Sequence, residues 1–405
     1  SSNNTVAGIA LQFGASTNVI ENNVISGNGG YGIYSFTSVG FITPLRQSGN
    51  IIRNNKIGVN GDGSAALGNR NSGVYVGDNS VDTQIGPGNV ISGNGATGAD
   101  TVFGVNIGGY LGTQSAFISG TRVTGNKIGT DATGTKALPN AGGGVQVTSS
   151  TGTVIGGAGG NPATPGGTAN LISGNSIAGV RLKDSIGFGA GTSNNVVTNN
   201  WIGLNIAGTA ALPNGSGVYF SNSANNFTVG PNNVISGNRN DGVLIEASNN
   251  ATAAQQVRLN TITGNLIGTD ASGNAAVPNQ GYGVQLRGGT FTNTITGNHI
   301  TNNATGGVYL APSTNATPAS PTQNTFTGNT ISSNGAVGIT LTSASSQNVI
   351  GAPGAGNIIQ NHSSSGIEVQ SAGNTIQAND IRLNQIGILI NNAAGNTIGG
   401  ASVAT

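Results

Sequence analysis

The chain repeats a short pattern of apolar and polar positions from one end to the other. A glycine is followed by Val or Ile, then by any residue, and then, as a rule, by a second apolar residue. Side chains of a strand alternate between its two faces, so this pattern predicts short strands with one face inward. The pattern occurs thirteen times, with its glycines at Gly8, Gly32, Gly73, Gly104, Gly144, Gly179, Gly217, Gly242, Gly283, Gly307, Gly338, Gly366 and Gly387.

The steps between successive glycines give the length of one repeat. They run from 21 to 41 residues, and the short steps suit one coil of a three-sided solenoid. The four longest steps contain related segments such as IGTDATGTKALPN, which begins at Ile128. We therefore predict an all-β fold, a single parallel β-helix domain over residues 1–405 with about thirteen or more coils. Irregular coil insertions are predicted at 57–69, 128–140, 202–214 and 267–279.

Asparagines mark the corners between the predicted strands. The phrase NVISGN begins at Asn23, Asn89 and Asn233, and NLISGN begins at Asn170. Asn tolerates left-handed backbone conformations and bonds to neighbouring amides, which suits sharp corners. Equivalent Asn side chains in stacked coils are expected to form hydrogen-bonded ladders.

The Asn-containing phrases followed by the glycine motif resemble the repeat of right-handed parallel β-helices of the pectate-lyase-like superfamily. The insertion segments resemble those of large bacterial secreted and surface β-helix proteins. The resemblance covers essentially the whole chain and implies the fold. It leaves the activity open, because such repeats occur in lyases, glycosidases, tailspikes and adhesins.

Composition narrows the possible partners. Charged residues make up 6% of the chain, the formal net charge is +1, and Cys and Met are absent. With no field to attract phosphates or anionic lipids, we expect no nucleic-acid partner and no membrane insertion. Disulfides and thiolate metal sites are excluded, and an extracellular or cell-surface location is predicted.

Carboxylates are few for an enzyme of this fold: the chain has twelve acidic residues. Asp131 and Asp270 stand where two other insertions have Asn60 and Asn205, which indicates a turn-forming role. The Asp and Arg/Lys signatures of pectate lyases and polygalacturonases are not recognisable. We therefore predict no catalytic residues, no cofactor and no enzymatic activity.

Metal sites are not predicted either. The local acidic clusters are Asp62 with Asp78 and Asp82, and Asp241 with Glu246. Their spacing matches no calcium loop, so solvated turns are favoured over a weak Ca²⁺ site. His299 and His362 are 63 residues apart and fall in different coils, so they are interpreted as isolated surface histidines.

The third residue of each strand motif is expected to point outward. This row includes Tyr34, Tyr75, Tyr219 and Tyr309, interspersed with amides, and it is the candidate glycan-contact stripe. The alternative is that Tyr simply fits a pleated surface. Trp201 replaces the Lys of sister copies at an outward position and is a candidate contact between rods, or a tolerated substitution.

The two ends of the chain together spell one ordinary coil, since Asn396 to Gly8 of a following copy would span seventeen residues. This arithmetic favours head-to-tail stacking, as a homopolymer or as tandem repeats, over arbitrary truncation. The leading hypothesis is a structural unit of a filament or giant adhesin. The alternatives are a polysaccharide-active lyase or glycosidase and a passive glycan-binding module.

Overall fold

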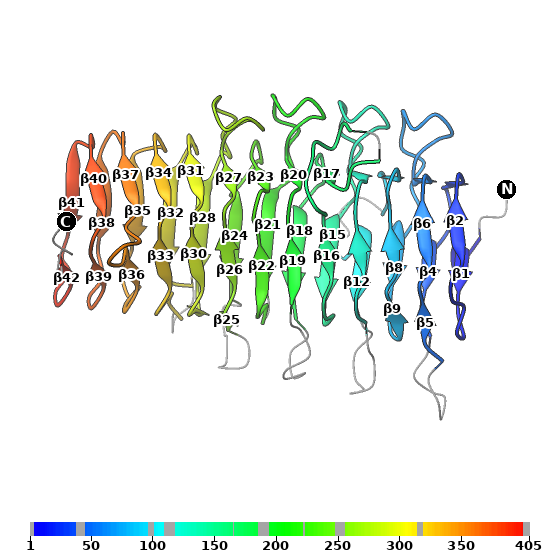
Figure 1. Cartoon of the computed structure of the whole chain (residues 1–405), viewed down its shortest axis with the longest axis horizontal. Helices are drawn as coiled ribbons and strands as arrows, with labels where there is room; N and C mark the ends of the chain where they lie inside the picture. The colour runs from blue at the N-terminus through cyan, green and yellow to red at the C-terminus, as the bar shows by residue number, and fades with distance from the viewer. Residues whose placement is uncertain are drawn as a thin grey trace. The chain divides into compact units, whose positions relative to one another are not determined.

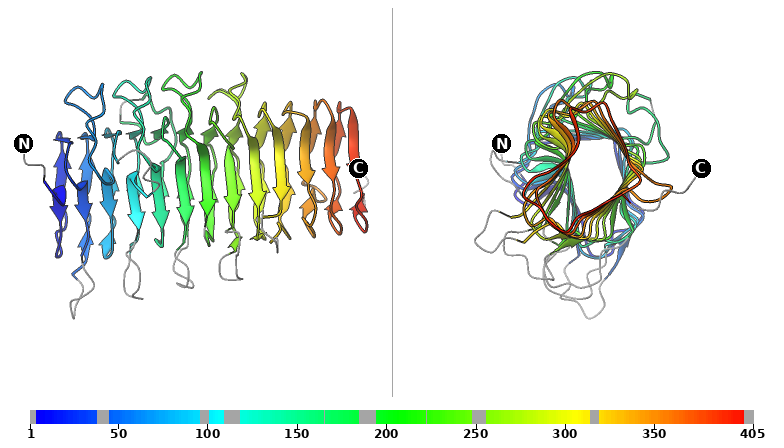
Figure 2. Two further views of the ribbon diagram at one scale, coloured as in Figure 1. Left: turned by 180° about the vertical axis from the view of Figure 1, so that it is seen from behind. Right: turned by 90° about the vertical axis from the view of Figure 1, so that its left-hand side faces the viewer.

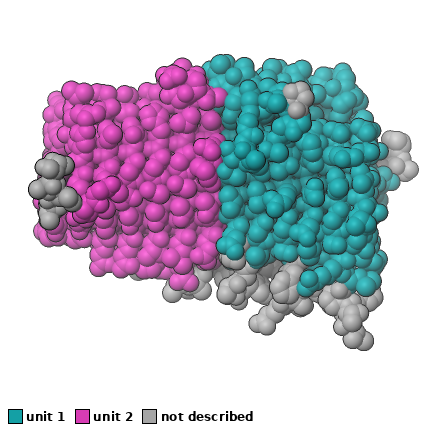
Figure 3. Space-filling view, viewed as in Figure 1, with its two compact units in different colours: residues 1–215 teal, residues 216–405 magenta. Residues whose placement is uncertain are grey.

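A computed structural model of the chain describes residues 4–37, 45–95, 101–108, 118–164, 166–184, 194–221, 223–247, 256–313 and 319–399. These residues form strands and turns, and no helix occurs among them. The chain divides into two compact units, Ser1–Gly215 and Ser216–Thr405, which are coloured separately in Figure 3. Each unit is built from parallel strands wound into coils.

Unit 1 contains three parallel sheets, each with six strands among the described residues. Its first sheet is made of β1 (Ala7–Leu11), β4 (Tyr31–Ser35), β8 (Val74–Val76), β12 (Phe103–Gly108), β15 (Gly143–Thr148) and β18 (Ala178–Lys183). Its second sheet is made of β2 (Val19–Glu21), β6 (Ile51–Arg53), β10 (Gln84–Ile85), β13 (Arg122–Val123), β16 (Val154–Ile155) and β19 (Asn195–Val197). Its third sheet is made of β3 (Val24–Ile25), β7 (Lys56–Ile57), β11 (Val90–Ile91), β14 (Lys127–Ile128), β17 (Leu171–Ile172) and β20 (Trp201–Ile202). A short extra pair is formed by β5 (Gln47–Ser48) and β9 (Ser80–Val81).

Unit 2 repeats this arrangement. Its first sheet is made of β21 (Ser216–Ser221), β24 (Val243–Glu246), β28 (Tyr282–Arg287), β32 (Gly306–Ala311), β35 (Val337–Leu341), β38 (Ser365–Val369) and β41 (Ile386–Ile390). Its second sheet is made of β22 (Phe227–Val229), β26 (Thr261–Thr263), β30 (Thr294–Thr296), β33 (Thr325–Thr327), β36 (Val349–Ile350), β39 (Thr375–Ile376) and β42 (Thr397–Ile398). Its third sheet is made of β23 (Val234–Ile235), β27 (Leu266–Ile267), β31 (His299–Thr301), β34 (Thr330–Ser332), β37 (Ile358–Gln360) and β40 (Asp380–Arg382). A short extra pair is formed by β25 (Val257–Arg258) and β29 (Thr290–Phe291).

Each coil gives one strand to each sheet, and within a unit the strands of successive coils lie side by side (Figure 1). Eleven of the thirteen motif glycines lie in a first-sheet strand, and Gly73 and Gly242 directly precede one. The prediction of an all-β right-handed parallel β-helix with about thirteen coils is confirmed. That residues 1–405 form a single domain stays a prediction.

The interior of each unit is filled by stacked rows of aliphatic side chains. In the third sheet of unit 1, Ile57, Ile91, Ile128, Ile172 and Ile202 follow one another in register and are fully buried. The motif glycine lies against such a row. A Cβ at Gly144 would be 2.5 Å from the carbonyl oxygen of Gly179 and 2.6 Å from a methyl of Ile172. The repeated glycine is therefore needed for close stacking of the next coil.

The four insertion segments are short hairpins. Each is closed by an antiparallel bridge: Val59–Ala66, Thr130–Ala137, Leu204–Ala211 and Thr269–Ala276. The Asp or Asn at the turn accepts two backbone N–H groups, as Asp131 does from Thr135 (3.0 Å) and Lys136 (3.1 Å). Asn60, Asn205 and Asp270 do the same, which explains why Asp and Asn interchange there.

In unit 1 the three hairpins project from the same edge of the coils and contact one another (Figure 1, Figure 2). The backbone N–H of Ala132 donates to Gly63 (2.9 Å), and that of Ile206 donates to Gly134 (2.9 Å). Beneath them, Val59, Val90 and Leu138 form a small apolar cluster. The hairpins thus cover outward positions of the third sheet that would otherwise be exposed.

Asparagines at the corners, most of them buried, form hydrogen-bonded ladders, as predicted. At the corner before the third sheet, each Asn amide except the last of a unit donates to the Asn of the next coil at 2.8–3.2 Å. The members are Asn23, Asn55, Asn89, Asn126, Asn170 and Asn200 in unit 1, and Asn233, Asn265, Asn298, Asn329, Asn357 and Asn379 in unit 2. Each coil therefore satisfies polar groups of its neighbours.

We expect Asn298→Ala to lower the free energy of unfolding by about 1–3 kcal/mol, measured as a lower midpoint of urea unfolding. The Asn298 side chain accepts the Asn265 N–H (3.1 Å) and donates to the Ile262 carbonyl (2.9 Å), so alanine leaves buried groups unpaired. Asn274→Ala, at an exposed hairpin position, is the matched control and is expected to change the midpoint little. Equal midpoints for the two variants would contradict a stabilising role for the ladder.

Candidate functional site

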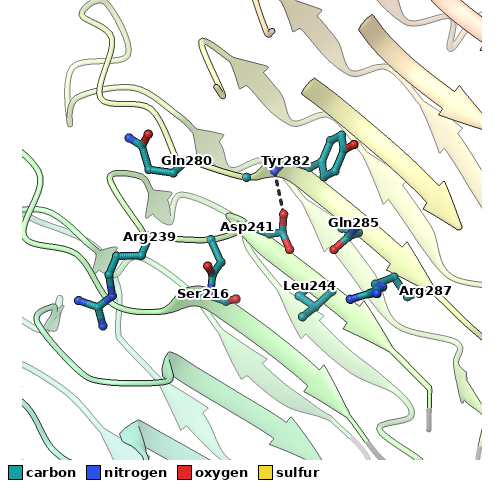
Figure 4. Close-up of a pocket in the computed structure, with 10 residues that line it drawn as sticks. Ser216, Arg239, Asp241, Leu244, Gln280, Tyr282, Gln285 and Arg287 are labelled. Carbon is teal, nitrogen blue, oxygen red and sulfur yellow. Dashed lines mark hydrogen bonds between the residues drawn. The ribbon is translucent and has the colours of Figure 1, made fainter. Parts of the chain in front are cut away.

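A groove of about 400 Å³ lies on the outer face of the first sheet in unit 2. Strands β21, β24 and β28 form its floor, and the turns before β24 and β28 form its wall (Figure 4). Its lining residues are Ser216, Arg239, Asn240, Asp241, Leu244, Gln280, Gly281, Tyr282, Gln285 and Arg287. Arg239 and Arg287 lie toward opposite ends of the groove, with Asp241 between them (Figure 4).

Asp241 is the buried carboxylate of this groove, with 7% of its surface exposed. Its Oδ1 accepts the backbone N–H of Tyr282 at 2.8 Å. A side chain at position 281 would collide with this oxygen, so Gly281 permits the close approach. Burial raises the pKa of Asp241 to about 6, against the lowering effects of the Tyr282 hydrogen bond and the Arg287 charge. The carboxyl group can therefore exchange a proton near neutral pH.

A second carboxylate, Glu246, stands beside the groove at the end of β24. Its Oε2 accepts the Tyr219 hydroxyl at 2.8 Å, and its Oε1 lies 3.6 Å from Arg287 Nη1. Register explains this pairing, because Glu246 is the direct neighbour of Arg287 in β28. Tyr219 and Arg287 are thus tied together through one carboxylate.

Tyr282, which lines the groove, stacks on Tyr309 of β32. The rings of Tyr282 and Tyr309 are 4.4 Å apart and inclined by 11°. Burial raises the pKa of the Tyr282 hydroxyl, with smaller contributions from Tyr309 and Asp241. A flat aromatic surface next to amide and carboxylate groups suits ligands that combine apolar faces with hydroxyls.

The structure places only two of the four tyrosines of the predicted stripe next to each other. In unit 2, Tyr219 and Tyr309 lie in the same row, but Leu244 of β24 and Gln285 of β28 stand between them. In unit 1, Tyr34 and Tyr75 are adjacent, with stacked rings 5.4 Å apart. Whether these tyrosines contact glycans stays a prediction.

Sequence reasoning missed the position that supplies the groove's central groups. Asp241 and Tyr282 each immediately precede a motif glycine, at Gly242 and Gly283. Alternation from the inward Val two residues later would place this position on the inner face, so the strand pattern carries no signal for it, yet the Tyr282 ring stacks on Tyr309 of the outer row. The sequence predicts a solvated turn at Asp241, but the structure buries this side chain.

Trp201 lies in β20 beside Leu171 of β17, on the outward side of the third sheet. Although it lies on this outward side, Trp201 is buried, with 9% of its surface exposed. The surface that Trp201 offers to another molecule is therefore small. The contact between rods predicted for it stays a prediction.

No group of three or more His, Asp or Glu residues that could hold a metal ion occurs among the described residues. Asp62 lies in an exposed hairpin, where its Oδ1 accepts the Ser64 N–H (2.9 Å) and hydroxyl (2.7 Å). These hydrogen bonds lower the Asp62 pKa. Asp78 is buried and Asp82 is exposed.

His362 is not a surface histidine, because it is 3% exposed. It occupies an Asn position in the ladder at the corner after the third sheet of unit 2. Its Nε2 accepts from Asn334 Nδ2 at 3.4 Å when its Nδ1 donates to Asn384 Oδ1 at 2.9 Å. Burial lowers the pKa of His362, and the hydrogen bond to Asn384 opposes this shift. His299 is half-buried in β31, and burial lowers its pKa as well.

The chain matches the model of a known protein family. The model of the family described as periplasmic copper-binding protein (NosD) matches residues 119–319, 269–353 and 316–400, which together cover more than half of the chain. No curated protein sequence matches the chain.

Two solved structures show the same fold. The periplasmic alginate epimerase AlgG is 12% identical, with a TM-score of 0.52 over 92% of this chain and 71% of the epimerase. A cysteine-to-alanine mutant of DFA-IIIase from Arthrobacter chlorophenolicus A6, in complex with DFA-III, is 11% identical, with a TM-score of 0.51 over 89% of this chain and 86% of that one. At this identity the likeness concerns the fold.

The prediction that the chain is not an enzyme is contradicted by these neighbours. Both proteins are named as enzymes, and both carry the β-helix fold that this chain shares. The absence of the pectate-lyase signatures from a parallel β-helix therefore does not exclude enzymatic activity. The described residues contain no helix that is long and apolar enough to cross a membrane.

Lowering the pH from 7.5 to 5 is expected to destabilise the protein through His362. The pKa is below its ordinary value of 6.5 in the folded state, so the unfolded state takes up the proton first and stability falls as the pH drops below about 6.5. His362→Asn restores the residue used elsewhere in the ladder, and its unfolding midpoint should fall less over this pH range. Urea unfolding of both proteins measures the difference; parallel pH profiles would refute the role of His362.

Proposed function

The chain belongs to the family described as periplasmic copper-binding protein (NosD), and we propose that it is a periplasmic or secreted protein that acts on a polysaccharide bound in the groove of unit 2. The observation that carries this proposal is the buried carboxylate of Asp241 in a groove with aromatic and cationic walls. The location follows from the family description and from the periplasmic alginate epimerase that shares the fold.

The chemistry proposed for the groove is general acid–base catalysis by Asp241. A catalytic acid or base works best when its pKa lies near the working pH, and the pKa of Asp241 is about 6. The Tyr282 N–H holds one carboxylate oxygen, so the group is oriented before substrate arrives. Glu246 is held by Tyr219 and Arg287 and has a positioning role for these side chains.

The groove offers two kinds of contact that suit a carbohydrate. The Tyr282 ring, which is supported from outside the groove by Tyr309, provides an apolar face for a sugar ring, and Gln285 and Gln280 provide amides for hydroxyls. Arg239 and Arg287 add positive charge at the two ends, which favours sugars bearing carboxylates. Elongated substrates suit such a surface, because it continues along the face of a sheet.

The hypothesis of a filament or adhesin unit has no support in the comparisons. Head-to-tail stacking of copies remains a prediction from the sequence of the two ends. The polysaccharide-active alternative is favoured because the solved structures that share the fold include an alginate epimerase and DFA-IIIase in complex with DFA-III.

Copper binding, which the family description names, does not fit the residues of this chain. Copper sites in proteins are built from imidazole, thiolate and thioether ligands. This chain has no Cys, no Met and two His, and the two His lie in different coils. His362 is also occupied by Asn334 and Asn384 in the ladder. We therefore derive no step through copper.

Replacing the proposed catalytic carboxyl is the direct test of the groove. Asp241→Asn keeps an oxygen acceptor for the Tyr282 N–H but removes the titrating group, so turnover of the polysaccharide is expected to fall by about 10²–10⁴-fold. The assay follows new reducing ends, unsaturated ends and changes in sugar NMR signals over a panel of anionic and neutral polysaccharides.

Asp270→Asn is the matched control, because two sister hairpins already carry Asn at this position. It should retain full turnover. Unchanged turnover in Asp241→Asn would overturn the catalytic role. A wild-type protein that binds a polysaccharide without altering it would instead be a passive glycan-binding module, and absence of both binding and turnover would reject the proposal.

Titration with copper tests whether this chain lacks the copper site that the family description names. We expect calorimetry with Cu²⁺ to show no saturable site at one equivalent, since only His299 offers an imidazole outside the ladder. Electron paramagnetic resonance should likewise show no bound Cu²⁺ with nitrogen ligands. A stoichiometric signal that disappears in His299→Ala would prove this expectation wrong.

A further inference from the structure

Five asparagines of the chain are followed directly by glycine: Asn28, Asn60, Asn94, Asn214 and Asn334. An Asn-Gly pair is prone to lose its side-chain amide, because glycine has no side chain to keep its backbone nitrogen away from the asparagine side chain. Four of the five asparagines are buried at corners of the coils. Asn60 instead lies at the turn of the first insertion hairpin, where Gly61 is exposed.

The four corner pairs are restrained by hydrogen bonds to other coils. Each side-chain amide donates to a neighbouring coil, as Asn214 Nδ2 does to the Ile172 carbonyl at 2.9 Å. The N–H groups of Gly29, Gly95 and Gly335 donate to backbone carbonyls of the preceding coil at 2.8–2.9 Å. Reaction at these pairs therefore requires that the coil first opens locally.

The Asn60 pair has a free backbone nitrogen and an activated carbonyl. The Gly61 N–H donates to no group in the part of the chain that the structure describes, and a Cβ on Gly61 would meet no atom within 4 Å. Asn60 Oδ1 accepts the backbone N–H groups of Ser64 (2.9 Å) and Ala65 (3.0 Å). Negative charge develops on this oxygen when a nucleophile attacks Cγ, so these two donors stabilise the attack.

We propose that Asn60 is a site of spontaneous deamidation in the folded protein. The Gly61 nitrogen forms a bond to Asn60 Cγ and loses its proton to solvent, and the Cγ–Nδ2 bond breaks with release of ammonia. The product is a succinimide ring. Water then adds to one carbonyl of the ring and breaks its bond to nitrogen, which gives aspartate or isoaspartate without oxidation or reduction. Either product adds a negative charge to the hairpin at neutral pH.

The hairpin fits the aspartate product, because sister hairpins carry aspartate at the same position. Asp131 and Asp270 each accept two backbone N–H groups in the way that Asn60 does. The isoaspartate product has an additional carbon in the backbone, which displaces one strand of the hairpin at the Val59–Ala66 bridge. Deamidation therefore gives one product that matches the sister hairpins and one that distorts the turn.

The hairpin at Asn205 provides an internal comparison. Asn205 Oδ1 accepts the N–H groups of Thr209 (3.1 Å) and Ala210 (3.3 Å), in the same arrangement as at Asn60. The next residue is Ile206, whose N–H donates to the Gly134 carbonyl at 2.9 Å. The branched side chain and this hydrogen bond both hinder attack on Asn205. Asn205 should therefore stay intact while Asn60 is converted.

Peptide mapping of the folded full chain after incubation in mildly alkaline buffer tests this site. Trypsin cleaves after Lys56 and Arg70 and releases residues 57–70, in which mass spectrometry detects conversion of the Asn60 amide to a carboxyl group. Asn60 should react about tenfold or more faster than the corner pairs, since those must first give up buried hydrogen bonds. Conversion of Asn60 no faster than that of the corner pairs would overturn the proposal, and so would equal rates at Asn60 and Asn205.

Gly61→Ala is the matched variant for the attacking nitrogen. The added methyl fits the hairpin without a contact, so the fold is retained, but it restricts the backbone of residue 61. Asn60 should then react several-fold more slowly, with circular dichroism verifying the fold, and an unchanged rate would contradict attack by the Gly61 nitrogen. In urea, all five Asn-Gly pairs should react at similar rates. A preference for Asn60 that persists in urea would show that the structure does not select it.

Discussion

The buried asparagines at the corners of the coils form hydrogen bonds with the coils before and after them. Asn170, for example, donates to Asn200 of the next coil (2.8 Å) and to the Val123 carbonyl of the preceding one (2.7 Å). A buried amide without partners costs about 1–3 kcal/mol, so a coil out of register would leave several such groups unpaired. The same register places the aliphatic rows on top of one another. The Asn ladders and the aliphatic rows therefore both require the same register between successive coils.

Departures from asparagine show how this constraint operates. At the corner before the second sheet of unit 1, Thr83 and Thr121 stand in register with Asn50, and their buried hydroxyls have no hydrogen-bond partner. The shorter side chain cannot span the distance between coils. His362 is the opposite case, because a neutral imidazole has one donor and one acceptor and can replace an Asn within the ladder. Threonine therefore interrupts the ladder, whereas histidine continues it because the donor and acceptor roles are preserved.

Since the core and the ladders hold the coils together, the outward positions of the first sheet are free to carry chemistry. In unit 2 they bring together Asp241, Glu246, Arg287 and two stacked tyrosines, whose sequence separations reflect one strand per coil. In unit 1 the corresponding positions carry rings and amides. The outer face of the first sheet therefore carries a titrating carboxyl in unit 2, whereas the row from Tyr34 to Gln146 in unit 1 carries none. The family description names copper, yet neither surface supplies copper ligands.

The sequence by itself determined the repeat, and with it the fold. The glycine motif, the inward Val and Ile and the corner asparagines recur because every coil meets the same neighbours, so a local pattern is enough to predict the strands, the corners and the turn role of Asp131 and Asp270. Only the tertiary structure decided which outward residues meet. Asp241 and Tyr282 are 41 residues apart, and the raised pKa of Asp241 comes from burial that no local pattern records. Trp201 and His362 were likewise expected at the surface by alternation and isolation, but the insertion hairpins make outward positions of the third sheet internal, and the ladder buries the histidine. Periodicity fixes the direction of a side chain, whereas its environment depends on the length and course of the segments between the repeats.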